Sequence, residues 1–239
     1  MIRLLLLCSI AVFAQDPPYL REDGWRFLLS GGVAGWQTQD GSAMPWRTAK
    51  GILFDCGPRL GATAAPGDRI LNAPDGKVAN IVSRAVFGDV ELYVEYLIPK
   101  GSNSGVYLQG LYEVQVFDSY GAVSLKSSDG GGIYHRWIGE KPVGGSAPRV
   151  NASYAPGQWQ SFHIVFRAPR FDGGGRKTEN ARFIRVVHNG QVVQENVEVE
   201  GGTRSHMPIA EAARNPLMLQ GDHGAVAYRN IYVKEVKLP

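Results

Sequence analysis

Side chains with strong hydrogen-bonding capacity recur at two-residue spacing in two short segments of the chain. The segment "YEVQVFD" carries Glu113 and Gln115, and the segment "LMLQGDHG" carries Gln220, Asp222 and His223. Carboxylates and amides exchange hydrogen bonds with hydroxyl groups, and aromatic rings offer a flat apolar face for stacking. These residue types together indicate a surface that is suited to holding a sugar.

The spacing of these residues predicts the strands that must position them. Side chains alternate between the two faces of a strand, so Glu113 and Gln115 lie opposite Val114 and Val116. Four segments divide in this way into an apolar and a polar face: Val90–Ile98, Gly105–Gln109, Tyr112–Phe117 and Pro216–Gln220. If these segments are neighbours in one sheet, their polar faces merge. The alternative is the wet side of an ordinary antiparallel sheet, but the absence of lysine from all four segments favours a ligand surface.

Strand patterns dominate the rest of the chain, and helical periodicity is nearly absent. The only candidate for a short turn or helix is Pro208–Ala213, and Asn189-Gly190 predicts a tight hairpin turn. Further strands are predicted at Gln158–Arg167, Ala181–His188, Gln191–Val197 and Ala227–Val236, with weaker ones at Gly51–Phe54 and Asn80–Ser83. This pattern predicts an all-β fold, a jelly-roll β-sandwich of two antiparallel sheets.

Two long loops are expected to carry function, because long ordered loops in a β-domain usually do. They run over 119–147, which contains "DGGGIYHRW", and over 198–215. The glycine-rich segment 168–180 has the composition of a mobile hairpin tip instead.

The N-terminus and the charge balance narrow the class of protein. Residues 1–14 resemble a secretory signal peptide, with Arg3 before an apolar run, so we expect an exported protein, periplasmic or secreted. The remaining residues 15–239 suit a single domain, which we expect to be monomeric and to lack a membrane span. The 25 basic and 22 acidic residues are nearly balanced and form no basic run, which argues against nucleic acid as a partner. Cys56 is expected to be a small buried residue.

Longer stretches of the chain resemble a known family. The segments "FGDVELYVEYLIPKGSNSGVYLQGLYEVQVFDSYG" and "LMLQGDHGAVAYRNIYVKEV" are similar to the 3-keto-disaccharide hydrolase domain family, as are "GWQTQDG", "KGILFDCG" and "APGQWQSFHIVFRAPR". The resemblance runs in order from about Trp25 to Val236. It implies a concanavalin-like jelly roll, in agreement with the strand pattern.

The resemblance also implies activity on glycosides whose sugar ring carries a ketone at C3. Such a ketone acidifies the hydrogen on C2, and the glycosidic bond at C1 lies β to the ketone. A base can remove the C2 proton, the aglycone can leave by elimination, and water can then add to the unsaturated sugar. This route requires a base, a group that stabilises the enolate and an acid for the leaving group.

Within this resemblance, Glu113 and His223 are the candidate acid and base, in either order. Gln115, Gln220 and Asn103 could donate hydrogen bonds to an enolate or to hydroxyls. The remaining candidates for sugar binding are Glu95, Tyr107, Asp118, Arg136, Trp137 and Asp222.

Several alternatives stay open on the sequence. Asn103 could serve only the backbone of its turn, Asp222 and His223 could merely close a loop, and Trp137 could be a surface feature. No cofactor is certain, although a divalent metal held by Glu113, Asp118 or His223 could stabilise the enolate. The alternative to an enzyme that acts on a 3-keto-glycoside is a non-catalytic carbohydrate-binding module of the same fold.

Overall fold

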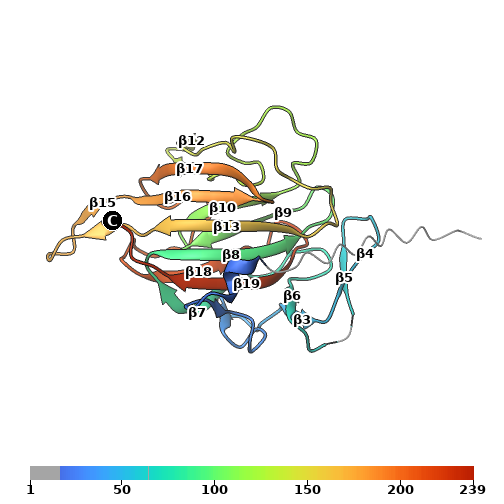
Figure 1. Ribbon diagram of the computed structural model, residues 1–239. Helices are drawn as coiled ribbons and strands as arrows, with labels where there is room; N and C mark the ends of the chain where they lie inside the picture. Colours follow the sequence, from blue (N-terminus) through green and yellow to red (C-terminus); the bar gives the residue numbers. More distant parts are fainter. Residues whose placement is uncertain (1–16, 64) are drawn as a thin grey trace, which may run out of the picture.

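Two antiparallel sheets packed face to face form the body of the protein. The computed structural model describes residues 17–63 and 65–239 (Figure 1). The larger sheet has eight strands. Its order is β17 (Gln191–Val199), β16 (Ala181–His188), β13 (Gln160–Arg167), β8 (Val90–Leu97), β19 (Ala227–Glu235), β6 (Arg69–Leu71) and β3 (Arg47–Ala49), with β1 (Arg26–Phe27) paired to β19.

The smaller sheet has five strands and lies behind the larger one in Figure 1. Its order is β10 (Tyr112–Phe117), β9 (Asn103–Leu108), β18 (Asn215–Leu219), β7 (Ile81–Phe87) and β2 (Trp36–Thr38). All pairings in both sheets are antiparallel. The predicted all-β jelly-roll sandwich is therefore confirmed.

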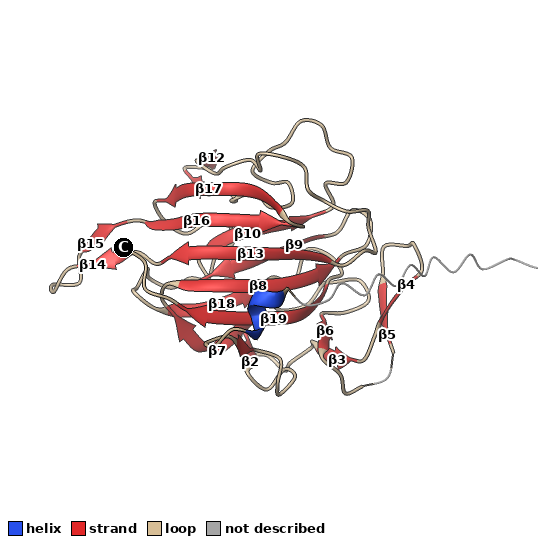
Figure 2. Cartoon of the chain, viewed as in Figure 1, coloured by secondary structure: helices blue, strands red, loops and turns tan. Residues whose placement is uncertain are grey.

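Three small hairpins project from this body, as Figure 2 shows. They are β4 (Ile52–Phe54) with β5 (Leu60–Ala62), β11 (Arg136–Ile138) with β12 (Lys141–Val143), and β14 (Arg170–Phe171) with β15 (Lys177–Glu179). The hairpin β11–β12 lies inside the segment that was predicted as one long loop. The hairpin β14–β15 lies in the predicted hairpin tip.

Helix is confined, in the described ranges, to one short 3-10 turn at Pro18–Arg21, which lies over the outer face of the large sheet in Figure 2. The segment Pro208–Ala213 forms bends and no helix, so the helical option predicted there is wrong. Among the helices described, none is long and apolar enough to cross a bilayer. The predicted signal peptide at 1–14 lies outside the described residues.

The hydrophobic core lies between the two sheets, on the faces that the alternation predicted. Strand β8 contributes Leu92 and Val94, and strand β10 contributes Val114 and Val116, all at most 1% exposed. A buried side chain of this size contributes about 1.5–3 kcal/mol to folding, so one sheet face of such residues fixes the register of its strand.

The fold contradicts two predictions made from the sequence. Strand β8 belongs to the large sheet, whereas β9, β10 and β18 belong to the small one, so the four polar faces do not merge into one surface. Cys56 is exposed rather than buried, in a turn after β4 where its backbone adopts a positive φ of 65°.

Candidate functional site

The outer face of the small sheet gathers the polar side chains of three strands. Glu113 on β10 lies opposite Tyr107 on β9, which in turn lies opposite Met218 on β18. Gln115 lies opposite Gly105, and the backbone N–H of Gln220 donates to the carbonyl of Gly105 at 3.0 Å. The apolar face of the same strands is in the core, so hydrophobic burial alone turns these polar groups outward together.

The carboxyl group of Glu113 lies over a glycine. A Cβ atom on Gly105 would stand 2.2 Å from Glu113 Oε1, closer than any real contact of this kind. The absence of a side chain at Gly105 therefore makes the room that this carboxyl group occupies.

The backbone of Glu113 is held from two loops. Its N–H donates to Thr203 Oγ1 at 3.1 Å, and its carbonyl accepts from the N–H of Tyr134 at 3.1 Å. Residues 131–134 extend the edge of the small sheet beyond β10 through a bridge between Val114 and Ile133. Glu113 itself is only 2% exposed, so its carboxyl group lies below the surface.

Burial raises the pKa of Glu113 to about 8. Its contact with the Tyr107 hydroxyl opposes this shift, and the negative charge of Asp222 adds to it. The Tyr107 hydroxyl also lies 3.2 Å from the carbonyl oxygen of Arg204, to which it donates its single hydrogen. A protonated Glu113 can then donate to the phenol oxygen, which is consistent with a carboxyl group that is mostly neutral at pH 7.

The amide groups beside Glu113 are used unequally. Gln115 Nε2 donates to Asn103 Oδ1 at 3.3 Å and to the carbonyl of Ser128 at 3.2 Å, so both of its hydrogens have partners. The Oε1 atoms of Gln115 and Gln220 are buried and accept no hydrogen bond within the described chain. The amide nitrogen of Gln115 therefore anchors Asn103 and the glycine-rich loop, and the Oε1 atoms of Gln115 and Gln220 keep the capacity to accept a hydrogen bond.

Asp222 and His223 lie at the rim of this face. Asp222 Oδ1 is 2.6 Å from His223 Nδ1, and both side chains are 48% exposed. The following residue, Gly224, packs against Ser102 and the backbone of Asn103, because a Cβ there would meet both within 3 Å. The rim loop is thereby held beside Asn103, and the negative charge of Asp222 adds to the effect of burial on the pKa of Glu113.

Glu95 does not belong to this face, although it was predicted as a sugar ligand. It lies on β8 in the large sheet, where Glu95 Oε2 is 2.5 Å from Arg229 Nε and Oε1 accepts from Tyr93 at 2.8 Å and from Asn230 at 3.2 Å. Arg229 also lies over the ring of Trp159, 4.2 Å from its centroid. These contacts make Glu95 the partner of Arg229 in a structural ion pair.

Two further predicted sugar ligands are engaged elsewhere. Arg136 forms an ion pair with Glu200. Asp118 Oδ2 accepts the backbone N–H of Gly101 at 2.8 Å, which fastens the turn before β9. Trp137 follows Arg136 on β11 and is 46% exposed, with the guanidinium of Arg204 4.1 Å from its ring centroid.

Gly105, Thr203 and Arg204 were not predicted from the sequence as site residues. Thr203 and Arg204 lie in the loop 198–215, whose length did indicate function, but their contacts with Glu113 and Tyr107 join residues about ninety positions apart. No local pattern records such contacts.

The residues proposed as metal ligands do not form a metal site. No group of three or more His, Cys, Asp or Glu side chains comes together in the part of the chain that the structure describes. Glu113, Asp118 and His223 therefore do not fit a shared ion.

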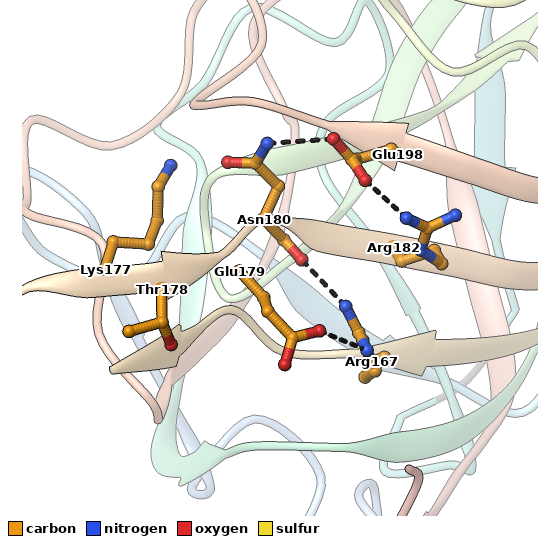
Figure 3. A pocket seen from close by; sticks show the side chains of 7 residues that line it. All are labelled: Arg167, Lys177, Thr178, Glu179, Asn180, Arg182 and Glu198. Atoms are coloured by element: carbon orange, nitrogen blue, oxygen red, sulfur yellow. Dashed lines mark hydrogen bonds and ion pairs between the residues drawn. The ribbon is translucent and has the colours of Figure 1, made fainter. Parts of the chain in front are cut away.

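A charged cavity of about 250 Å³ lies away from these residues (Figure 3). Arg167 and Arg182 are cross-strand neighbours there, and they form ion pairs with Glu179 and Glu198 respectively. Because its cations are neutralised by its own carboxylates and no candidate site residue lines it, we do not assign this cavity a function.

Comparison with known structures shows the class of fold. A structure from Parabacteroides distasonis described as a "putative glycosyl hydrolase" is 24% identical, covers 90% of this chain and 84% of its own, and has a TM-score of 0.65. Two more structures with that description from the same organism are 16% and 14% identical, with TM-scores of 0.57 and 0.54. The first of these covers 89% of this chain and the second 93%, each over 99% of its own length. The fold is therefore a jelly roll of the kind found in these glycosyl hydrolase-like proteins.

The family follows from the sequence profile. Residues 24–234 match the family described as the 3-keto-alpha-glucoside-1,2-lyase-like domain, so the chain belongs to this family. A comparison with curated proteins finds no match. A carbohydrate is the class of ligand that fits this family.

Proposed function

We propose that the protein cleaves 3-keto-glycosides by elimination and hydration. The observation that carries the proposal is Glu113, a buried carboxyl group with a pKa near 8 on a sheet face that also presents Tyr107 and Gln220. A strongly raised pKa at a site of hydrogen-bonding groups is typical of a catalytic acid or base. The family description names the same substrate chemistry.

The reaction proceeds in two balanced steps. A base removes the proton on C2, the electron pair forms the enolate of the C3 ketone, and the C1–O bond then breaks as the aglycone oxygen takes a proton. The product is an unsaturated keto sugar. Water adds across its C1–C2 double bond, with hydroxyl at C1 and hydrogen at C2, so that the net reaction is hydrolysis.

Glu113 suits the role of the acid. A carboxyl group with a pKa of about 8 carries its proton at pH 7 and can give it to the departing aglycone oxygen. The same group can then accept a proton from the water that adds at C1, which restores its starting state.

His223 suits the role of the base, oriented by Asp222 at 2.6 Å. A carboxylate on one ring nitrogen fixes the tautomer and leaves the other nitrogen to accept the C2 proton. The amides of Gln220 and Asn103 are the candidate donors to the enolate oxygen or to sugar hydroxyls. Gln115 is left out of this role, because both of its amide hydrogens are engaged.

The test incubates the purified protein with a 3-keto-disaccharide and with the same disaccharide unoxidised, with and without a chelator. We expect cleavage of the keto sugar alone and a loss of about 100-fold or more in kcat for Glu113→Gln, the range for removal of a general acid. The matched control is Glu95→Gln, a buried glutamate on the other sheet, which should retain kcat. Binding of both sugars without turnover would instead establish a carbohydrate-binding module, and cleavage of the unoxidised sugar would refute the elimination route.

The proposal includes export from the cytoplasm, supported by the apolar run within residues 1–14. Expression of the full chain followed by N-terminal sequencing of the periplasmic and secreted fractions should yield a protein that begins near Gln15. Recovery of the intact N-terminus only from the cytoplasm would contradict it.

A further inference from the structure

Arg204 and Trp137 form an exposed pair beside the candidate site. Arg204 is solvent-exposed, its guanidinium lies 4.1 Å from the ring centroid of Trp137, and Trp137 is itself 46% exposed. The neighbouring Ile138 is 50% exposed, so the hairpin β11–β12 presents an apolar surface next to a cation. A guanidinium that lies over an indole face keeps N–H groups free at its edge, where they can still reach a ligand.

Hydrogen bonds link the segments that carry this pair to the strands that carry Glu113 and Tyr107. The backbone N–H of Arg204 donates to the carbonyl of His135 at 2.9 Å, and the carbonyl of Arg204 accepts from the Tyr107 hydroxyl. The N–H of Tyr134 donates to the carbonyl of Glu113. The segment 134–137 therefore leads from Glu113 outward to Trp137.

Charge is distributed unevenly along this path. Burial is the main cause of the raised pKa of Glu113 and of Tyr107, and the negative charge of Asp222 adds to both shifts, whereas the positive charge of Arg204 opposes the rise in the pKa of Tyr134 that burial causes. Arg204 also adds to the effect of burial in lowering the pKa of His135. The site therefore has a negative end at Asp222 in the rim loop and a positive end at Arg204, which lies beside β11.

The positive end is not neutralised by the protein. The neighbouring Arg136 forms an ion pair with Glu200, but no carboxylate lies within ion-pair distance of Arg204 in the described parts of the chain. An exposed cation without a partner, packed on an aromatic ring, is available for a ligand that carries negative charge.

The direction of the reaction places the aglycone at this end. Glu113 protonates the oxygen between the keto sugar and the aglycone, so the two groups must extend to opposite sides of Glu113. The proposed base His223 is on the side of the rim loop, which assigns the keto sugar to that side. The aglycone then extends toward Tyr134, Arg204 and Trp137.

We propose that Arg204 and Trp137 form an aglycone subsite that selects a flat or ring-shaped aglycone bearing a carboxylate. The ring packs against the exposed part of the indole, and the carboxylate accepts hydrogen bonds from the guanidinium. Both an aromatic acid and a uronic acid have this chemistry. The inference rests on the proposed cleavage of 3-keto-glycosides, because that reaction fixes which side of Glu113 the aglycone occupies.

The experiment compares pairs of 3-keto-glucosides that differ only in the carboxylate: 4-carboxyphenyl against phenyl, and glucuronyl against glucosyl. In the wild type we expect KM to be about tenfold lower for the carboxylated member of at least one pair, the effect of one charge-assisted hydrogen bond. The pair that shows the difference identifies the aromatic or the uronic acid as the source. Arg204→Met should remove the difference in KM within the pair, and Trp137→Ala should raise KM for both members. The control Arg149→Met removes an exposed arginine that pairs with Glu195 and should change neither.

Two outcomes overturn the subsite: equal KM values within both pairs in the wild type, or a preference that persists in Arg204→Met. If the wild type cleaves none of the four compounds, the proposed function fails separately. Isothermal titration with 4-hydroxybenzoate and with glucuronate then decides the subsite alone. Binding of either acid that is lost in Arg204→Met supports the subsite, and absence of binding to the wild type refutes it.

Discussion

Replacement of Glu113 by glutamine should stabilise the folded protein at pH 8 and have little effect near pH 5. In the folded state the pKa of Glu113 is about 8, raised by burial from the ordinary value of 4.5. Between these two pH values the unfolded chain releases the proton and the folded protein retains it. The free energy of unfolding of the wild type therefore falls as the pH rises from about 4.5 to about 8, and it stays low above this range.

The size of the effect follows from the same shift. Each pH unit between the two pKa values is worth about 1.4 kcal/mol, so the ionisation of Glu113 costs the folded state up to about 5 kcal/mol. Relaxation of the two loops that hold the backbone of Glu113 at high pH would reduce this value, and we expect about 2–5 kcal/mol. Glutamine has nearly the same shape, cannot ionise and can still donate to the Tyr107 oxygen, so the variant escapes this cost.

The measurement is urea unfolding of the wild type and of Glu113→Gln at several pH values between 5 and 9. The difference between the two proteins cancels the titration of every other group, and it should grow with pH and reach a plateau near pH 8. A difference that is constant over this range would show that Glu113 ionises as an ordinary surface carboxyl group, and the assignment of Glu113 as a neutral acid would be wrong.

Two other changes test how the site is positioned. Gly105→Ala should displace the Glu113 carboxyl group, because the added Cβ would stand 2.2 Å from Oε1. We expect kcat to fall by about 100-fold while the circular dichroism spectrum is retained. An unchanged kcat would show that the position of the carboxyl group over Gly105 is not needed for activity. Glu95→Gln should cost about 2–4 kcal/mol of stability in urea unfolding because it leaves the Arg229 charge without a carboxylate. It should leave KM unchanged, and a raised KM would return Glu95 to the binding surface.

The alternation of side chains predicted which face of each strand is apolar, and the structure confirms it. Leu92 and Val94 of β8, like Val114 of β10, lie in the core as the period of two requires. This success has a physical basis, because one buried face is enough to fix the orientation of a strand. The same period placed Glu113 and Gln115 together on the opposite face.

The period could not predict which strands are neighbours. Strand β8 has the same division into two faces as β10, yet it pairs with β13 and β19 in the other sheet. Sheet membership depends on contacts between residues far apart in sequence, such as Glu95 with Arg229, and these leave no mark on local spacing. The contacts between the loops and Glu113 could not be predicted either, because Thr203, which accepts the backbone N–H of Glu113, lies outside any strand with a periodic pattern.

The difference between Glu95 and Glu113 shows why burial alone does not identify a functional carboxylate. Both residues are at most 3% exposed, and both lie on the outer face of a sheet. Glu95 has a cation and two neutral donors around it, so its charge is compensated and it serves the fold. Glu113 has no cationic side chain within ion-pair distance among the described residues, and Asp222 adds negative charge nearby. A carboxyl group placed in that way costs the fold stability whenever it ionises. The presence of such a destabilising carboxyl group is accounted for if the protein uses the proton that Glu113 holds at neutral pH.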